Sequence, residues 1–152
     1  MRSKALALLL VEDDESHAEI TRRNLEEFKT QVRDLVHVTN GQAALDHLET
    51  AASSANPHSA LPDLIMLDLR LPRVDGIEVL SRIKADARLK HIPVIILSTS
   101  EAARDVLACY EKGASAYLSK PAEYKQYREV IRAFGEFWLC TSRYAGDSTT
   151  GS

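Results

Sequence analysis

The chain has 152 residues, of which 45% are hydrophobic and 27% are charged, and its formal net charge at pH 7 is −3. This size suits one domain with its own core, and the small negative charge argues against nucleic-acid binding, which usually needs a basic excess. The first apolar run, at residues 5–11, is too short to cross a membrane and precedes acidic residues rather than a cleavage site. Cys109 and Cys140 show no metal-binding spacing. We therefore expect a cytoplasmic protein with no membrane partner.

Short apolar segments alternate with amphipathic segments along the chain. The apolar segments predict five strands, at residues 5–11, 35–38, 64–67, 94–97 and 116–118. The amphipathic segments predict five helices, at residues 16–28, 43–50, 77–83, 101–112 and 123–139. Asp14 or Ser16 is suited to cap the first helix, and Gly113 is suited to the end of the fourth.

The segments between these elements predict loops and one tail. Residues 51–61 are rich in Ala, Ser, Asn and Pro without periodicity, so we expect an exposed loop there. Residues 144–152 contain Gly, Ser and Thr and offer little to bury. We predict one domain at residues 1–140 and a flexible tail at residues 141–152.

Five strands that alternate with five helices predict an α/β fold, a doubly wound five-stranded parallel sheet with helices on both faces. In the flavodoxin-like strand order 2-1-3-4-5, strands 1 and 3 lie side by side. The carboxyl ends of strands 1, 3, 4 and 5 then converge at one edge, where ligands bind in such folds. The residues at those ends are Glu12, Asp13, Asp68, Ser98 and Lys120.

Asp68 follows four consecutive apolar residues and therefore stands at the end of the third strand. A carboxylate can form a covalent acyl phosphate, but the phosphoryl group and the acceptor are both negative, so cations must bring them together. Mg²⁺ suits this task because it binds carboxylates, water and phosphate oxygens. Asp13 and Asp68 are the natural direct ligands, and Glu12 could bind directly or through water. The backbone carbonyl of Arg70 could add a further ligand.

Lys120 and Ser98 complete the predicted chemistry. Phosphoryl transfer depends mostly on positioning and charge neutralisation. Lys120 supplies a second positive charge, and the Ser98 hydroxyl can donate a hydrogen bond to a phosphoryl oxygen. Simpler roles exist for the same residues. The acids at 12–14 favour a helix start, residues 98–100 are also expected to cap the helix that follows, and Lys120-Pro121 could be an ordinary turn.

Five short motifs stand in a fixed order along the chain. They are Val11-Glu12-Asp13-Asp14, Leu67-Asp68-Leu69-Arg70-Leu71-Pro72, Asp75-Gly76, Pro93-Val94-Ile95-Ile96-Leu97-Ser98 and Ala114-Ser115-Ala116-Tyr117-Leu118-Ser119-Lys120-Pro121. Over about residues 5 to 139, the chain resembles the receiver domain of two-component response regulators. The separations between Asp68, Ser98 and Lys120 are also similar to those of the family. Each motif alone is weak, whereas all five in order form a strong signal.

The resemblance implies a receiver fold and a role in signal transduction, not that of an enzyme acting on other substrates. The phosphohistidine of a partner histidine kinase would phosphorylate Asp68, and the regulator would promote only its own phosphorylation and dephosphorylation. Asp13, Asp68 and the Arg70 carbonyl would bind Mg²⁺. Ser98 occupies the family's Ser or Thr position, and Lys120 occupies that of its invariant lysine.

The resemblance also implies a conformational switch. Lys120-Pro121 would be a cis peptide, a geometry found almost only before proline. Tyr117 matches the aromatic switch position, where the ring would follow the serine hydroxyl inward and change the face made by the fourth helix, fifth strand and fifth helix. Arg70 and Ser100 occupy positions that vary in the family and affect loss of the phosphoryl group.

A narrower resemblance rests on residues 51–61, 97–100 and 136–139. These segments are similar to those of small single-domain regulators that serve phytochrome-type sensor kinases and commonly dimerise. No output domain is expected after Leu139, so the output would be a protein contact or onward phosphotransfer. An exposed apolar patch in the last helix would mark an interface between two copies. The possible dimer contacts are Phe134, Phe137 and Trp138.

Other functions stay open at this point. A phosphorylation-independent binding module or a phosphorelay intermediate could use the same fold, although none of the expected acids and no lysine is missing. An aspartate-nucleophile phosphatase is disfavoured because it needs a second acid at the position that Arg70 occupies. A flavin carrier is disfavoured because no phosphate-binding glycine loop follows the first strand. The histidines show no metal-ligand spacing and are expected to be structural or solvent-facing. They are His17, His37, His47, His58 and His91.

Overall fold

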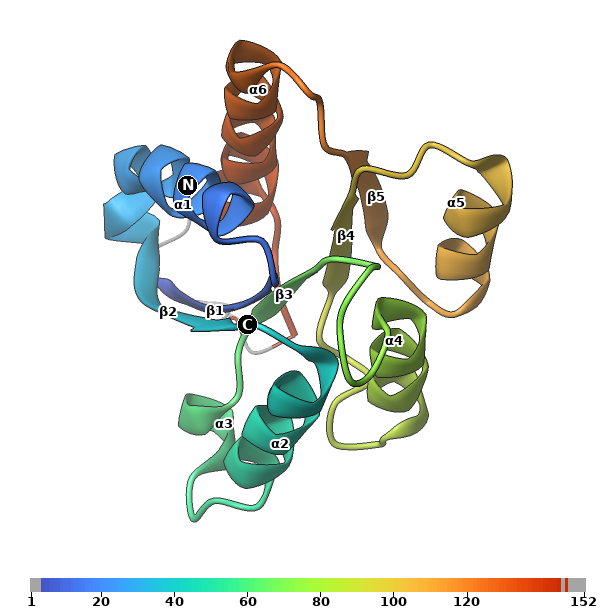
Figure 1. Cartoon of the computed structure of the whole chain (residues 1–152). Coiled ribbons are helices and arrows are strands. Elements are labelled where there is room, and N and C mark those ends of the chain that lie inside the picture. Colours follow the sequence, from blue (N-terminus) through green and yellow to red (C-terminus); the bar gives the residue numbers. More distant parts are fainter. Residues whose placement is uncertain (1–3, 146, 148–152) are drawn as a thin grey trace.

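The computed structural model of the chain describes residues 4–145 and residue 147 (Figure 1). The strands are β1 (Leu6–Val11), β2 (Val32–Val38), β3 (Leu64–Leu67), β4 (Val94–Ser98) and β5 (Ala116–Ser119). The α-helices are α1 (Glu15–Leu25), α2 (Gly41–Ala52), α3 (Pro57–Ala60), α4 (Gly76–Ala85), α5 (Ala103–Glu111) and α6 (Tyr124–Phe134). A 3-10 helix, η1 (Glu26–Gln31), continues α1, and a π-helix, η2 (Gly135–Thr141), continues α6.

The five strands form one parallel sheet in the order β2-β1-β3-β4-β5, which confirms the predicted fold. Val11 at the end of β1 pairs with Leu67 at the end of β3. Ser98 at the end of β4 pairs with Ser119 at the end of β5. Because these last residues are in register, the residues that follow them emerge at the same edge of the sheet.

Helices cover both faces of the sheet (Figure 1). One core layer forms between the sheet and α2, α4 and α5, and the other forms between the sheet and α1, η1, α6 and η2. Leu9 and Val11 of β1 belong to the first layer, whereas Leu8 and Leu10 belong to the second. Successive side chains of a strand point to opposite faces, so a strand buried on both faces must be continuously apolar. This explains the unbroken apolar runs of the sequence.

Residues 51–61 contain more regular structure than the predicted loop. Helix α2 extends to Ala52, and the short helix α3 begins at Pro57, which brings the α-helices of the described chain to six rather than five. Proline is favoured at the first position of a helix because its fixed φ suits the turn and its missing N–H would be unpaired there. Pro57 occupies this position.

The segment predicted as one last helix is an α-helix only as far as Phe134 and is a π-helix from Gly135 onward. Helix α6 ends at Phe134 and the chain continues as the π-helix η2. A Cβ atom at Gly135 would lie 2.3 Å from the Phe28 ring, so the close approach of η1 and η2 requires glycine. Tyr144 is buried beside this segment, and its hydroxyl donates to the Trp138 carbonyl at 2.5 Å. Part of the predicted tail, residues 146 and 148–152, lies outside the described residues, so the division at residue 140 remains a prediction.

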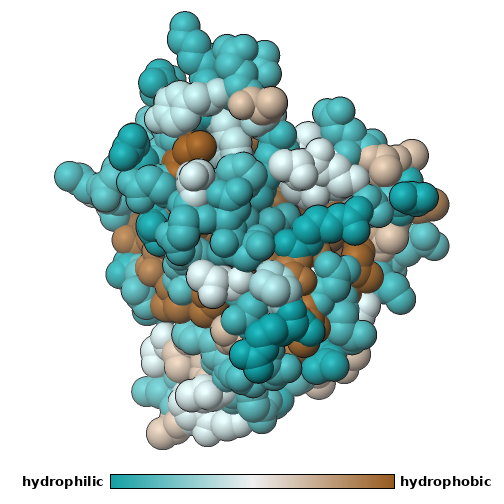
Figure 2. All heavy atoms as spheres, viewed as in Figure 1, coloured by the Kyte–Doolittle hydropathy of each residue, from teal (hydrophilic) through white to brown (hydrophobic). Residues whose placement is uncertain are grey.

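The surface is largely hydrophilic in the view of Figure 2, with hydrophobic residues in separate patches. Within the described chain, the large hydrophobic side chains most exposed are Leu107, Tyr110, Tyr124 and Phe137. The first two lie on α5, Tyr124 begins α6, and Phe137 lies in η2.

Within residues 4–145, no helix combines the length and the apolar character needed to span a bilayer.

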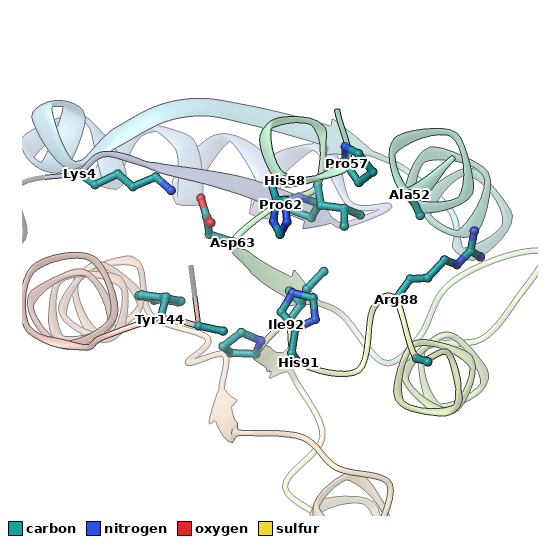
Figure 3. A pocket seen from close by; sticks show the side chains of 14 residues that line it. Lys4, Ala52, Pro57, His58, Pro62, Asp63, Arg88, His91, Ile92 and Tyr144 are labelled. Carbon is teal, nitrogen blue, oxygen red and sulfur yellow. The ribbon is translucent and has the colours of Figure 1, made fainter. Parts of the chain in front are cut away.

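A hollow of about 640 Å³ lies at the amino-terminal edge of the sheet (Figure 3). His58 and His91 line it, together with Asp63, which directly precedes β3. Asp63 accepts a hydrogen bond from the Ala7 amide at 2.9 Å. Arg88, on another part of the wall, is paired with acidic neighbours. This hollow is therefore at the opposite end of the strands from the acids predicted to act together.

Gly76 provides a test of the packing around the loop after β3. A Cβ atom at Gly76 would lie 2.3 Å from the Asp68 carbonyl oxygen, and the Gly76 amide donates to the Leu69 carbonyl at 2.8 Å. We expect Gly76→Ala to lower the free energy of unfolding by about 1–3 kcal/mol, because the backbone of the loop must shift. Urea unfolding measures this, with Ser81→Ala on the same helix as the control. Equal stability of the two variants would contradict the close contact.

Candidate functional site

Three carboxylates meet where β1 and β3 end. The Asp68 amide donates to the Val11 carbonyl at 3.0 Å, and the Glu12 amide donates to the Val38 carbonyl at 3.0 Å. Strand-like pairing thus continues one residue beyond each strand and fixes the backbone of these acids. One carboxylate oxygen from each of Glu12, Asp13 and Asp68 lies within 4.8 Å of the others.

The burial of the three acids differs. Glu12 and Asp68 are 2% and 8% exposed, whereas Asp13 is open to solvent. Like charges this close repel one another, and the repulsion grows as water is excluded. A cation among them removes that repulsion. Carboxylate oxygens are the ligands that Mg²⁺ and Mn²⁺ prefer, so the donor set fits such an ion.

Lys120 supplies a buried positive charge beside these acids. Its side chain is 1% exposed, and its ammonium group donates to Glu12 Oε1 and, at 3.3 Å, to Asp68 Oδ2. The Lys120 amide donates to the Ser98 carbonyl at 2.7 Å, which fixes the loop after β5 to the end of β4. A buried charge needs partners of opposite sign, and the two buried carboxylates provide them.

Burial raises the pKa of Glu12 from its ordinary value of 4.5 to about 7. The loss of solvation, which disfavours the charged carboxylate, is the largest cause. The hydrogen bond and the positive charge of Lys120 oppose the increase, and the negative charge of Asp68 adds to it. Perturbed carboxylates of this kind are common at functional sites.

Ser98 and Tyr117, the predicted switch residues, are connected through Ser100. The Ser98 hydroxyl, fully buried, accepts a hydrogen bond from the Ser100 amide at 3.1 Å. The Tyr117 hydroxyl donates to the Ser100 carbonyl at 2.7 Å. Ser100 Oγ donates to Asp105 Oδ2 at 2.5 Å. One residue of the loop after β4 therefore contacts the site, the aromatic ring and helix α5.

Arg70 projects from the loop after β3, and its guanidinium group donates to Asp105 Oδ2 at 3.3 Å. The Arg70 side chain is 68% exposed and Asp105 is 21% exposed, so screening by water weakens this ion pair. Asp105 nevertheless connects the loop that follows Asp68 with the loop that contains Ser100. The predicted role of the Arg70 carbonyl as a metal ligand remains a prediction.

Three expectations differ from the structure. The Lys120-Pro121 peptide is trans, as are all peptide bonds of the described residues, in keeping with the intrinsic preference for trans even before proline. Residues 98–100 do not cap α5, whose N-cap is Ala102, because Ser98 and Ser100 are engaged in the loop. Phe134, one of the possible dimer contacts, lies in the core at 3% exposure rather than on an exposed patch.

Sequence reasoning overlooked two histidines that adjoin the site. His17 Nδ1 lies 3.1 Å from Lys120 Nζ. His37 Nε2 lies 2.8 Å from the Glu12 carbonyl oxygen, toward which it donates. Both positions could have been recognised: His17 is in the first turn of the helix after Glu12, and His37 is in the strand beside β1. Because these histidines show no metal-ligand spacing, they were expected to be structural or solvent-facing, and their role as hydrogen-bonding neighbours of the site was not predicted.

A doubly wound sheet with three acids and a lysine at its carboxyl edge defines a class of phospho-acceptor signalling domains. The sequence model of the response regulator receiver domain matches residues 8–132. The chain belongs to this family. Among the described relatives, the probable methanogenesis regulatory protein FilR2 of Methanothrix harundinacea is 37% identical over 139 residues, which cover 91% of this chain and 87% of that protein.

Other similar proteins are response regulator Rcp1 and a cyanobacterial phytochrome response regulator. Response regulator Rcp1 of Synechocystis sp. is 37% identical over 134 residues, covering 88% of this chain and 89% of that protein. The crystal structure of the phosphorylated cyanobacterial phytochrome response regulator RcpA covers 93% of this chain and 99% of its own, with 33% identity and a TM-score of 0.84. The Mn²⁺-bound form of Rcp1 covers 91% and 98%, with 33% identity and a TM-score of 0.80.

The pKa of Glu12 leads to a prediction about stability. Between pH 4.5 and about 7, the folded, metal-free protein holds a proton on Glu12 that the unfolded chain has released. The free energy of unfolding should therefore fall as the pH rises through this window, and Glu12→Gln should remove that contribution. Urea unfolding in chelator at several pH values measures the slopes, with exposed Glu26→Gln as the control. A wild-type slope in Glu12→Gln would refute the assignment.

Proposed function

We propose that the protein is the phospho-acceptor of a two-component system and that Asp68 receives the phosphoryl group from a histidine kinase. The observation that carries this proposal is the buried Asp68 carboxylate, which adjoins two other acids and receives a hydrogen bond from Lys120. An Asp68 oxygen attacks the phosphorus atom, the P–N bond of the phosphohistidine breaks, and its electron pair remains on the imidazole nitrogen. The product is an acyl phosphate on Asp68.

Mg²⁺ is the cation we assign to the acidic cluster. Asp13 and Asp68 would bind it directly, Glu12 directly or through water, and the Arg70 carbonyl would add a ligand. The bound ion supplies positive charge that offsets the negative charge of the donor and acceptor. The fit of the carboxylate donors supports the assignment, as does the Mn²⁺-bound form of the related Rcp1.

Lys120 and Ser98 would stabilise the phosphoryl group. Lys120 Nζ already lies beside Asp68 and offers a positive charge to a phosphoryl oxygen. The Ser98 hydroxyl accepts a bond from Ser100, yet a hydroxyl that accepts can still donate its own proton. Its turn toward the phosphoryl group would weaken the bond to Ser100 and release the loop to which Tyr117 is bound.

This switch would act on the face made by α5, β5 and α6. The loop that contains Ser100 leads into α5, where Leu107 and Tyr110 are 60% and 49% exposed. The Tyr110 hydroxyl accepts a hydrogen bond from the Tyr117 amide at 3.1 Å. Phosphorylation would therefore change an apolar surface that is available to a protein partner.

The partner we propose is a phytochrome-type histidine kinase, in the cytoplasm. The similarity to the phytochrome response regulator RcpA supports this choice. Cys109 and Cys140 are free thiols, which agrees with a reducing compartment.

Onward phosphotransfer to another protein, the phosphorelay alternative, would use the same acyl phosphate on Asp68. A phosphorelay would be recognised by transfer of the labelled phosphoryl group from Asp68 to a histidine residue of a second protein.

Labelling by a small phosphodonor tests the proposed function. We expect acetyl phosphate with Mg²⁺ to add one phosphoryl group to the wild-type protein, to add none to Asp68→Asn, and to react poorly in the presence of chelator. Mass spectrometry of the intact protein measures the product, and Asp46→Asn on the exposed side of α2 is the control. Absence of label from the wild type, or equal labelling of Asp68→Asn, would rule out the proposal.

We also infer that two copies associate through η2. Phe137 is 52% exposed and its ring contacts Trp138 edge to face, with ring centroids 5.0 Å apart. Two exposed or half-buried aromatic rings side by side form an apolar patch that a second copy could cover. Buried Phe134 takes no part in it.

The dimer leads to a separate prediction. Phe137→Glu places a charge in the proposed interface and should shift the protein to monomer in sedimentation experiments, by at least about tenfold in the dissociation constant. Tyr124→Glu, at another exposed aromatic residue on the preceding helix, is the control. The inference fails if the wild type is monomeric both with and without phosphodonor, or if Phe137→Glu dimerises as well as the wild type.

A further inference from the structure

His17 lies between Lys120 and helix α6. It is in the first turn of α1, its side chain is 29% exposed, and its amide donates to Asp14 Oδ1 at 3.0 Å. Its ring packs near the buried ring of Tyr127, with centroids 5.8 Å apart. Nδ1 lies 3.1 Å from Lys120 Nζ. The helix start and the Tyr127 ring therefore hold the imidazole in place beside the ammonium group.

The three protons of the Lys120 ammonium group match three acceptors. A lysine ammonium group donates only, so a hydrogen bond between the two groups makes His17 Nδ1 the acceptor and places the proton of a neutral imidazole on Nε2. Asp14 Oδ2, 3.8 Å from the same nitrogen, lies beyond hydrogen-bond distance. The other two acceptors are Glu12 Oε1 and Asp68 Oδ2. Together the three acceptors fix both the position of the nitrogen and the rotation of its protons.

Two of these acceptors change during the proposed reaction. Asp68 becomes the acyl phosphate, and Glu12 takes part in holding the metal ion. His17 is neither a proposed metal ligand nor a reacting group, so its contact with Lys120 can persist throughout. Because the other partners of the Lys120 ammonium group change, one unchanging partner is needed to keep its positive charge directed at the reacting atoms.

We propose that His17 is a positioning residue for phosphoryl transfer: its Nδ1 accepts a hydrogen bond from Lys120 and keeps the ammonium group directed at Asp68. The proposal rests on the proposed function of Asp68. It assigns His17 no contact with the phosphoryl group. The effect should therefore appear in the rate of transfer at saturating phosphodonor, and the concentration of donor or metal that gives half the maximal rate should remain unchanged.

Two substitutions separate this role from simple packing. His17→Phe keeps a ring beside Tyr127 but removes the acceptor. His17→Asn loses the ring but carries an oxygen at the place of Nδ1. We expect His17→Phe to reduce the maximal rate of Asp68 labelling by acetyl phosphate and Mg²⁺ about tenfold, the lower end of what loss of an orienting partner costs. His17→Asn should recover most of that rate, and exposed His91→Phe should equal the wild type.

The outcomes discriminate between the possibilities. A wild-type maximal rate in His17→Phe overturns the proposal, and so does an equal loss in His17→Phe and His17→Asn, which would indicate packing alone. Failure of the wild type to take any label would instead refute the proposed function. In that case nitrogen NMR of the His17 ring decides the matter: an unprotonated Nδ1 that responds to Lys120→Met supports the contact, and a proton on Nδ1 overturns it.

Discussion

A buried ammonium group among carboxylates is the interaction on which the rest of the site depends. Lys120 joins the end of β5 to acids that follow β1 and β3, residues far apart in the sequence. Removal of the lysine would leave the carboxylates buried without a positive partner, and removal of the carboxylates would leave the ammonium group buried alone; either change is strongly unfavourable. The acids and the lysine therefore require one another, and a cation that binds the acids changes the balance of charge around all of them. Electrostatics rather than shape gives the site its chemistry.

The rigid sheet fixes the positions of these charged residues. Strands buried on both faces are held by two core layers, and the charged residues stand only one or two positions beyond them. The backbone pairing of Glu12 and Asp68 with residues of neighbouring strands extends that rigidity to the acids. Groups placed at the ends of rigid elements are positioned more accurately than groups on long loops.

Much of this architecture could be predicted because its signals are local. Apolar runs show the buried strands, and the fixed edge of a parallel sheet brings together Asp13, Asp68 and Lys120. The short helix at Pro57 was missed because four residues carry no period, although proline is favoured at its first position. The place of His17 at the start of the helix after Glu12 could be recognised, but its contact with Lys120 could not, because the two residues are 103 positions apart. Such a contact arises because α1 packs beside the loop that follows β5, which the pattern of one segment does not reveal.

Ser100 uses its amide, its carbonyl and its hydroxyl in three different directions. Because three neighbours hold Ser100, a shift of this residue toward one of them would strain its hydrogen bonds to the other two. In the proposed switch, such surroundings would favour two discrete arrangements over a continuous range of them. In an information-processing sense, the loop after β4 would then act as a binary element: a displacement of the buried Ser98 hydroxyl would either be resisted or be transmitted to the Tyr117 ring and to α5.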